Sequence, residues 1–570
     1  MIRIKSLRKV DFPLLSILAL AALVRYWGIS FGLPYVAARP DETTVMNVAM
    51  TFFSGDFNPH FFRYPTLHMY CLFCLYCGYF LFGLLTGRYL CLRDFAREYV
   101  INPTNFFLLD RFFSAFLGVA TVYITYRLAR EMFGRRIALI SSFFLALAYL
   151  HARDSHFGVT DVPAAFLVIC SMLFILKSRS SRNLRDYLYA GILAGLAAST
   201  KYAGVLLLVP IFSAHILNSL EEGKSLGKSL LDKRVLLFIA ALAAAFLLTT
   251  PFALLDYPKF ASHLTYEIHH LSRGHQIILG RGWWYHLRFS LPLGLGWSLF
   301  LASLLGFFIL LKRDAKKGIL LYSFPLAYYL LSGKGYTVFL RYMIPLVPFL
   351  CISAAICVVE VSDALRRRLR LHGNVSALLL AVFIILPSAN SLLQFNRLIA
   401  KKDNRAIAAE WVSGNIPPHA SIYLTGPIWR RHQTHPALEL LESKFGLTDS
   451  LKAASSSDSG LGALGEYDEW TYEEKSGKFL FDGRIMDSLP QYIILRESPL
   501  RAYDRIPRGI AEVLNRYYSL RESFRAIDTN DKRNWFDQQD AFYLPFAGFS
   551  NVQRPGPNIY IYERKDSPAR

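Results

Sequence analysis

The chain has 570 residues, of which 53% are hydrophobic and 18% are charged, and its mean hydropathy is +0.29. A soluble protein carries about 25% charged residues, so this composition excludes an ordinary soluble multidomain protein. The formal net charge of +21 could indicate a nucleic-acid partner. The basic residues, however, lie in short clusters between apolar runs, as in cytoplasmic loops that face anionic lipid, and we expect no nucleic-acid binding.

Apolar runs close to the roughly 20 residues that cross a bilayer recur from Phe12 to about Pro387, and none is found from Gln394 to Arg570. The sequence therefore predicts an α-helical polytopic membrane domain at residues 1–390 and a small soluble α/β domain at 391–570. None of the seven cysteines lies in the second domain. This distribution argues against a disulfide framework and against a cysteine zinc site.

The N-terminus, MIRIKSLRK followed by FPLLSILALAALV, has the make-up of a signal peptide with Ala19-Leu20-Ala21 as its cleavage site. A retained first helix is the alternative that we favour. Many further apolar segments follow, and Arg25-Tyr26-Trp27 is typical of an interfacial girdle at the far end of a first span.

Basic clusters set the expected orientation, because loops rich in Lys and Arg stay in the cytoplasm. The clusters are Tyr126–Arg136, Lys177–Arg185, Glu221–Arg234, Leu311–Lys317 and Asp363–Gly373. All of them, with the N-terminus, are cytoplasmic if spans lie near 12–30, 106–128, 137–150, 162–176, 187–199, 203–219, 235–250, 289–311, 318–332, 342–359 and 374–389. We therefore expect about 11 to 13 transmembrane helices and an extracytoplasmic C-terminal domain, in the plasma or inner membrane.

The segment Pro65–Gly87 is also long and apolar enough to cross. A single extra crossing here would invert every later basic cluster. The segment is therefore expected to be either a helix that lies in the outer leaflet or half of a hairpin that returns near Phe106.

The C-terminal domain has the pattern of ordinary globular sequence. Asp403 is a candidate N-cap of a helix that reaches about Val412 and stops at Gly414, and a short strand follows. The stretches QYIILRE and NIYIYER predict further buried strands. The domain is expected either to dock the acceptor or act as a lid, or else to be a purely structural cap.

In this orientation, the remaining polar residues gather in outer loops. These loops contain Asp41-Glu42, Arg63-Tyr64, His151–Asp161, Lys201-Tyr202, Tyr266–Gln276 and Gly333–Tyr342. A charge at the membrane boundary is costly unless it is paired or hydrated, so a cavity walled by these loops is the expected functional site.

The motifs RYWGISFGLPY…RPDE, FRYPTL, SHFGVTDVPAAF and GLAASTKYAG follow one another in this order. In this arrangement the chain resembles the polyprenyl-phosphate-sugar-dependent glycosyltransferases of the GT-C fold. Within them it is most similar to the group of protein O-mannosyltransferases and the aminoarabinose transferase of lipid A. The resemblance covers roughly residues 10–350.

The resemblance implies an inverting transfer of a monosaccharide from a polyprenyl-phosphate donor to a hydroxyl of a protein, lipid or glycan acceptor. Asp41 matches the catalytic base of the family, which takes the proton of the acceptor hydroxyl. Glu42 is then expected to orient the acceptor or to tune the basicity of Asp41. The alternative role for Asp41 is that of a helix N-cap, for a helix that starts near Thr43.

The leaving lipid phosphate needs a cation. Lys201 interrupts an apolar run and matches the TK position of the family, so it is the first candidate, with interfacial snorkelling as the alternative. Arg63 and Arg341 are further candidates, and each could instead be an interfacial anchor. Tyr64 and Tyr202 flank these cations and are expected to line the substrate site.

Asp161 matches a second acidic position of the family, in the loop that faces Asp41. A divalent cation such as Mg²⁺ or Mn²⁺ could bridge Asp41 and Asp161, although the group does not uniformly need a metal. Asp154 is a weaker substrate-binding candidate, with a salt bridge to Arg153 or to a neighbouring Arg as the alternative. Zinc binding by His269, His270 and His275 is disfavoured, because these histidines are expected in a long polar loop.

Two other classes remain as alternatives: a transporter or flippase of lipid-linked sugars, and a non-catalytic membrane scaffold. A transporter would place charges near the middle of its spans, often in related halves, and the sequence has no internal repeat. Neither the sugar nor the acceptor can be predicted from these residues.

Overall fold

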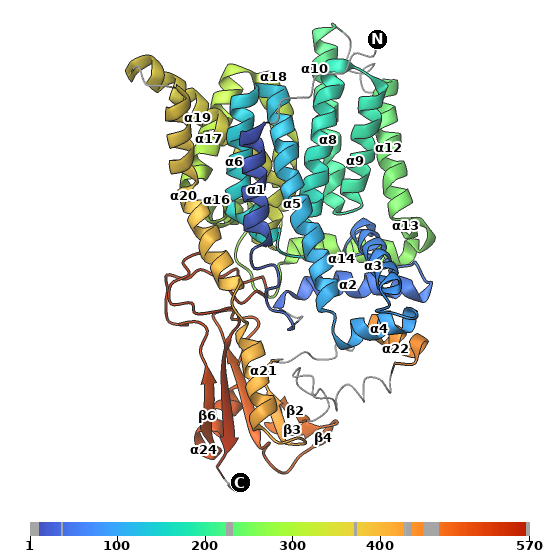
Figure 1. The fold of residues 1–570 in the computed structure, drawn as a ribbon, viewed down its shortest axis with the longest axis vertical. Helices are drawn as coiled ribbons and strands as arrows, with labels where there is room; N and C mark the ends of the chain where they lie inside the picture. Colours follow the sequence, from blue (N-terminus) through green and yellow to red (C-terminus); the bar gives the residue numbers. More distant parts are fainter. Residues whose placement is uncertain are drawn as a thin grey trace.

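The computed structural model describes residues 11–35, 38–223, 232–369, 373–426, 428, 436–447 and 467–565. The basic N-terminal residues 1–10, and parts of the clusters at 221–234 and 363–373, lie outside the described residues. Figure 1 shows a bundle of long helices in the upper part of the view and a small mixed domain below it, at the C-terminus.

Each predicted span overlaps a helix of the bundle. These helices run alongside one another in the bundle of Figure 1: α1 (Phe12–Tyr26), α5 (Thr104–Phe133), α6 (Arg135–Leu147), α8 (Asp161–Ser181), α9 (Leu184–Ala198), α10 (Leu208–Glu221), α12 (Lys233–Thr249), α17 (Trp297–Arg313), α18 (Ala315–Ser332), α19 (Val347–Leu369) and α20 (Gly373–Ile399). The last of them passes the predicted domain boundary at 390, so the membrane bundle continues directly toward the C-terminal domain.

Fewer helices satisfy both the length and the hydropathy that a membrane span requires. Of the described residues, 6 helices are long and apolar enough to cross a membrane, or up to 7 if the bent pair Gly282–Leu295 and Trp297–Arg313 is one span. The predicted number is larger because several helices of the bundle are short. Examples are α6 with 13 residues and α9 with 15 residues.

The predicted cytoplasmic clusters meet at one end of the bundle. Ion pairs join the described parts of these clusters: Arg136 to Asp363 (2.6 Å), Arg179 to Glu221 (2.9 Å) and Lys316 to Glu221 (2.9 Å). Arg313 also pairs with Glu360, which lies just before the last cluster. All the clusters therefore lie on the same side, as the parity of the predicted spans requires.

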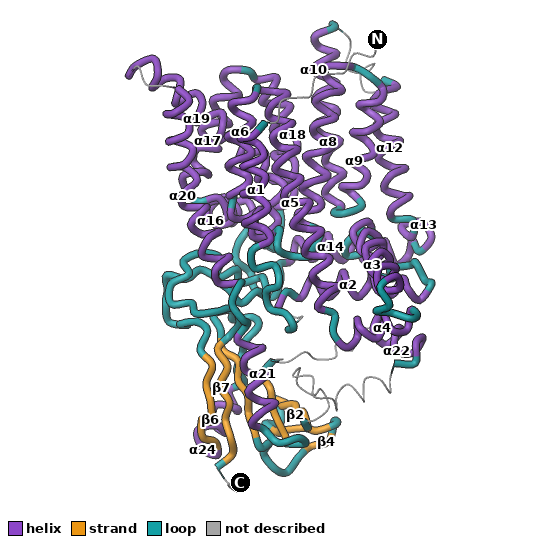
Figure 2. The backbone as a smooth tube through the Cα atoms, in the orientation of Figure 1, coloured by secondary structure: helices purple, strands orange, loops and turns teal. Residues whose placement is uncertain are grey.

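At the other end of the bundle lie shorter helices, namely α2 (Pro40–Thr51), α3 (Leu67–Leu85), α4 (Leu92–Ile101) and α14 (Tyr257–Arg273). Met46 of α2, Leu72 of α3 and Phe95 of α4 belong to one apolar cluster. Helix α3 is the predicted ambiguous segment, and Figures 1 and 2 place it below the bundle, beside α2 and α4. Helix α3 therefore lies outside the row of long helices, although it is one of the 6 described helices that are long and apolar enough to cross a membrane.

Several short elements connect these helices. They are η2 (Phe52–Ser54), α7 (Tyr149–Asp154), η3 (Tyr202–Leu207), α13 (Phe252–Leu255), α15 (Gly282–Tyr285), η4 (His286–Ser290), α16 (Leu291–Leu295) and η5 (Leu340–Leu346). Two of them, η3 and η5, begin at or beside predicted site residues, so they place side chains at the mouth of the bundle.

The C-terminal domain is built on a seven-stranded mixed sheet of order β4-β3-β2-β1-β5-β7-β6. Strand β1 pairs in parallel with β2 and β5, and the other pairs are antiparallel. The elements are α21 (Asn404–Asn415), β1 (Ser421–Leu424), α22 (Pro436–Phe445), β2 (Asp468–Glu473), β3 (Lys478–Phe481), β4 (Arg484–Ile485), β5 (Tyr492–Glu497), α24 (Arg508–Tyr517), β6 (Tyr518–Phe524) and β7 (Asn558–Arg564). The predicted strands QYIILRE and NIYIYER are confirmed as β5 and β7.

The start of this domain also follows the prediction. Asp403 caps α21, because its side chain accepts a hydrogen bond of 2.9 Å from the backbone amide of Arg405. The strand predicted after the helix is β1. Helix α22 lies apart from the sheet, next to α4 in Figure 1.

The arrangement of the clusters predicts the sidedness of the protein. Single cysteines at the exposed positions Arg185 and Arg367 are expected to react with an impermeant thiol reagent only from the cytoplasm, and those at Gln276 and Ser476 only from outside. The measurement is labelling of intact and of opened cells, with the chain's own cysteines replaced. Labelling of position 476 from the cytoplasm would contradict the predicted parity of spans.

Candidate active site

A cavity of about 650 Å³ lies where α2, α14, η3 and η5 converge, at the end of the bundle opposite the basic clusters. Most of the residues predicted from the sequence line it: Asp41, Arg63, Tyr64, Asp161, Lys201, Tyr202 and Arg341. Glu42 and Asp154 do not line it. The structure thus brings together residues that lie up to 300 positions apart in the chain, from Asp41 to Arg341.

Asp41 reaches the cavity from the first turn of α2. The helix begins at Pro40 with Arg39 in the N-cap position, so the alternative role of Asp41 as an N-cap is wrong. Its side chain is 33% exposed. A carboxylate at this point is favoured by the partial positive charge of the helix N-terminus.

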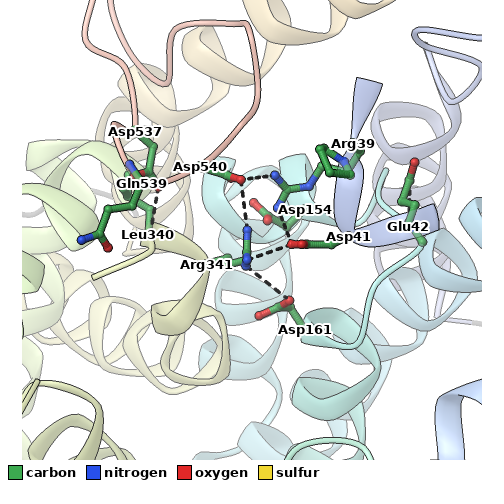
Figure 3. A network of polar contacts seen from close by, with 12 residues as sticks. Arg39, Asp41, Glu42, Asp154, Asp161, Leu340, Arg341, Asp537, Gln539 and Asp540 are labelled. Atoms are coloured by element: carbon green, nitrogen blue, oxygen red, sulfur yellow. Dashed lines mark hydrogen bonds and ion pairs between the residues drawn. The ribbon is translucent and has the colours of Figure 1, made fainter. Parts of the chain in front are cut away.

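Arg341 is the centre of the charged network in Figure 3. Its guanidinium group lies 2.8 Å from a carboxylate oxygen of Asp41, 3.1 Å from one of Asp540 and 4.0 Å from one of Asp161. Arg39 contacts the same oxygen of Asp540 and lies 3.8 Å from Asp41. Both arginines are buried, so water does not screen their positive charges, and these carboxylates neutralise the charges instead.

Lys201 and Asp161 form a second ion pair beside this network. Asp161 starts α8, and Lys201 lies immediately before η3, where the apolar run that it interrupts is broken. The ammonium group also lies 5.3 Å from the ring centroid of Tyr342. The predicted phosphate ligand is therefore paired with an acid in this structure.

Arg63 belongs to a separate wall of the cavity. Its guanidinium group stacks 4.1 Å from the ring centroid of Tyr266 on α14. The preceding residue is fixed to the same helix, because the amide of Phe62 donates a hydrogen bond of 2.9 Å to His263 Nδ1. Among the described residues, Arg63 has no acidic side chain within 4.0 Å. Next to it, Asp41 and burial raise the pKa of Tyr64 well above its usual value.

The other predicted tyrosine has a structural contact as well. The hydroxyl of Tyr202 donates a hydrogen bond of 2.7 Å to the carbonyl oxygen of Phe62. This bond joins the start of η3 to the segment that carries Arg63. The wall formed by residues 61–64, α14 and η3 is thus held by several contacts rather than by one.

The predicted polar loop at 266–276 is largely helical, because α14 continues to Arg273. His263, Glu267 and His270 lie three or four residues apart, so they share one face of α14 and line the cavity. This spacing is visible in the sequence and indicates a helix rather than a loop. Burial raises the pKa of Glu267 to about 7, against the opposing charges of Arg63 and Lys201, and burial lowers the pKa of His270.

Sequence reasoning also missed Asp540, which no motif marks. Burial acts to raise the pKa of Asp540, but the charges of Arg39 and Arg341 outweigh burial and hold the pKa below its usual value. This aspartate comes from a segment between β6 and β7, so the C-terminal domain takes part in the charged network.

Glu42 is placed differently from the prediction. Its carboxylate is fully buried and accepts two hydrogen bonds from Arg111, of 2.9 and 2.7 Å, and one of 2.9 Å from the amide of Gly158. It therefore holds α2 against α5 and the segment before α8, and it faces away from the cavity. A direct contact of Glu42 with an acceptor does not fit this position.

Asp154 is buried and forms an ion pair of 2.9 Å with Arg153, which is the alternative given to it from the sequence. It lies near Arg39 and Asp41 in Figure 3 but does not line the cavity. A direct contact with substrate from this position therefore does not fit the structure.

The residues do not fit a metal ion between Asp41 and Asp161. The guanidinium group of Arg341 occupies the space between the two carboxylates. In the part of the chain that the structure describes, no group of three or more His, Cys, Asp or Glu side chains could hold a metal ion. His270 Nε2 and His275 Nδ1 are 3.0 Å apart, but the two histidines are not part of such a group.

The environment of Glu42 predicts a structural effect. Replacing Glu42 with Ala leaves Arg111 buried without a counter-ion, which is expected to lower the free energy of unfolding by about 3–5 kcal/mol. Thermal unfolding in detergent measures this change. The exposed Glu131→Ala on α5 is the control and is expected to change stability by no more than about 0.5 kcal/mol. An unchanged melting temperature of Glu42→Ala would contradict the structural role.

Comparisons with known proteins add to this geometry. Residues 108–254 match the family model of dolichyl-phosphate-mannose-protein mannosyltransferases. The structure of ArnT from Cupriavidus metallidurans bound to undecaprenyl phosphate is similar, with a TM-score of 0.51 and 15% identity over 97% of this chain and 99% of that chain.

The apo structure of the same ArnT gives a TM-score of 0.50 and 15% identity, over 96% of this chain and 97% of that chain. No curated protein sequence matches the chain. The chain therefore has the GT-C fold expected from its sequence, and residues 108–254 match the dolichyl-phosphate-mannose-protein mannosyltransferase family.

Proposed function

We propose that the protein is a membrane glycosyltransferase that moves a monosaccharide from a polyprenyl-phosphate donor to an acceptor hydroxyl at the extracytoplasmic face. The observation that carries this proposal is the convergence of the Asp41 carboxylate with Arg63, Lys201 and Arg341 around one cavity at the outer end of the bundle. The reaction needs these two kinds of group, a proton acceptor and a cluster of cations for a phosphate. The acceptor hydroxyl belongs to a protein, a lipid or a glycan.

The proposed chemical step is an inverting displacement. The acceptor oxygen forms a bond to the anomeric carbon while the bond from that carbon to the phosphate oxygen breaks. The electron pair of the broken bond leaves with the polyprenyl phosphate, and the proton of the acceptor hydroxyl passes to Asp41. Asp41 is suited to this role because its side chain is partly exposed to the cavity, unlike that of Glu42.

The leaving phosphate gains negative charge, so cations must face it. Arg341 and Lys201 are already paired with carboxylates, whereas Arg63 contacts an aromatic ring and has no acid within 4.0 Å among the described residues. We therefore assign Arg63 the first contact with the donor phosphate. Lys201 and Arg341 then exchange part of their contact with Asp161 and Asp41 for the phosphate as charge develops. No step passes through a metal ion.

The ArnT structure with undecaprenyl phosphate supports a lipid-phosphate ligand for this fold. The two rival functions differ from a transferase in one product, free polyprenyl phosphate. A transporter of lipid-linked sugars or a non-catalytic scaffold releases no free polyprenyl phosphate, whereas a transferase releases one molecule for each sugar that it moves.

The proposed base gives a direct test. Asp41→Asn keeps the size of the side chain and removes the proton acceptor, so turnover is expected to fall by about 100-fold or more. Release of polyprenyl phosphate from a polyprenyl-phosphate sugar measures turnover, and binding of polyprenyl phosphate itself is expected to persist. Turnover within tenfold of the parent would contradict the role of Asp41 as the base.

The proposed phosphate ligand gives a second test. Arg63→Met keeps a long side chain and removes the charge, so the affinity for polyprenyl phosphate is expected to fall by about 1.5–3 kcal/mol, which is roughly ten- to 150-fold. Lys334→Met is the matched control, because Lys334 is exposed near the same end of the protein but does not line the cavity. Equal affinities of the two variants would indicate that Lys201 or Arg341, and not Arg63, makes the first contact with the donor phosphate.

A further inference from the structure

A short segment of the C-terminal domain is built into the membrane domain beside the cavity. Gln539 is fully buried, accepts a hydrogen bond of 2.6 Å from the amide of Val338, and donates one of 2.8 Å to the carbonyl oxygen of Ile277. Asp537 accepts one of 3.2 Å from the amide of Leu340, the residue before Arg341. Asp540 is therefore held in place by its neighbours in the chain, independently of its own ion pairs.

Asp540 faces two arginines of the membrane domain. It contacts Arg39 and lies 3.1 Å from Arg341, and its side chain is only 7% exposed. The same two arginines also approach Asp41, at 3.8 and 2.8 Å. Two buried cations are thus shared between two carboxylates, one from α2 and one from the C-terminal domain (Figure 3).

The sharing has a chemical consequence for Asp41. Without Asp540, both guanidinium groups would have Asp41 as their nearest remaining carboxylate, and a carboxylate held by two cations is a poor proton acceptor. The same loss would leave surplus positive charge at the wall of the cavity. That surplus favours binding of an anionic phosphate.

We propose that Asp540 is a positioning residue of the transferase site, which shares Arg39 and Arg341 with Asp41 and so keeps Asp41 able to accept a proton. This inference rests on the proposed function, because it assumes that Asp41 acts as the base. It also gives the C-terminal domain a defined part in the reaction: the domain supplies the charge that balances the arginines and does not merely cover the site.

The test is the purified full-length Asp540→Asn variant, with two independent measurements. Affinity for polyprenyl phosphate is expected to rise about three- to tenfold, while turnover of a polyprenyl-phosphate sugar is expected to fall about tenfold. These opposite changes separate the proposal from a structural role, because a loosened segment would weaken both. Asp540→Glu retains the charge and is expected to recover most of the turnover.

Asp528→Asn is the matched control, because Asp528 is exposed in the same segment between β6 and β7 and an asparagine oxygen can still accept its hydrogen bond of 3.1 Å from the amide of Asn530. It is expected to behave as the parent in both measurements. The double variant Arg39→Met with Asp540→Asn removes one cation together with the lost anion. Its turnover is expected to exceed that of Asp540→Asn, and it also serves if the single variant is too unstable to purify.

The outcomes separate the two proposals. If the parent protein releases no polyprenyl phosphate from the donor, the proposed function itself fails. If the parent is active and Asp540→Asn binds and turns over as the parent does, the positioning role is overturned. The role is also overturned if binding and turnover fall together, or if the double variant is no faster than the single one.

Discussion

A buried charge at this end of the bundle must be paired, because an isolated ion in a protein interior costs several kcal/mol. Arg341 shows the constraint most clearly, since its side chain is 8% exposed and is surrounded by Asp41, Asp161 and Asp540. These partners come from α2, α8 and the C-terminal domain. The geometry of the site therefore depends on one guanidinium group that joins three distant parts of the chain.

The same constraint divides the cavity into two sides. One side consists of paired charges, Arg341 with Asp41 and Lys201 with Asp161, and its net charge is close to balanced. The other side is the wall of α14, where Arg63 lies on the ring of Tyr266. An anionic ligand that enters such a cavity meets an available cation first and must then compete with carboxylates for the others. This order of contacts suits a donor whose negative charge grows as the reaction proceeds.

The C-terminal domain is more than a cover over this site. From the sequence it was expected to be either a docking or lid element or a structural cap, and Asp540 gives it a further role that neither description includes. The anchoring of Gln539 to backbone groups of residues 277 and 338 fixes the segment against the membrane domain. Movement of the C-terminal domain would therefore change the surroundings of Arg341, because Asp540 and Arg341 form a direct ion pair.

Much of the site could be predicted from local sequence. Lys201 interrupts an apolar run, where an unpaired charge is expensive, and that cost marks it without any knowledge of the fold. Asp41 and Asp161 lie in polar stretches between apolar runs, and the resemblance to the GT-C glycosyltransferases implied their roles. The basic clusters likewise indicated a common side. The helix α14 was missed because its polar residues suggested a loop, although the spacing of His263, Glu267 and His270 is that of one helical face.

The sequence by itself therefore determined the membrane bundle, its expected sidedness and most of the charged residues that line the cavity, because hydropathy and the cost of burying charge act on each segment separately. Only the tertiary structure decided which of these charges meet. Asp41 and Glu42 are neighbours, but successive residues of a helix point about 100° apart, so one faces the cavity and the other pairs with Arg111 inside the bundle. The partnership of Arg341 with Asp540 spans 199 residues, and no local pattern encodes a contact that forms only when two domains pack together.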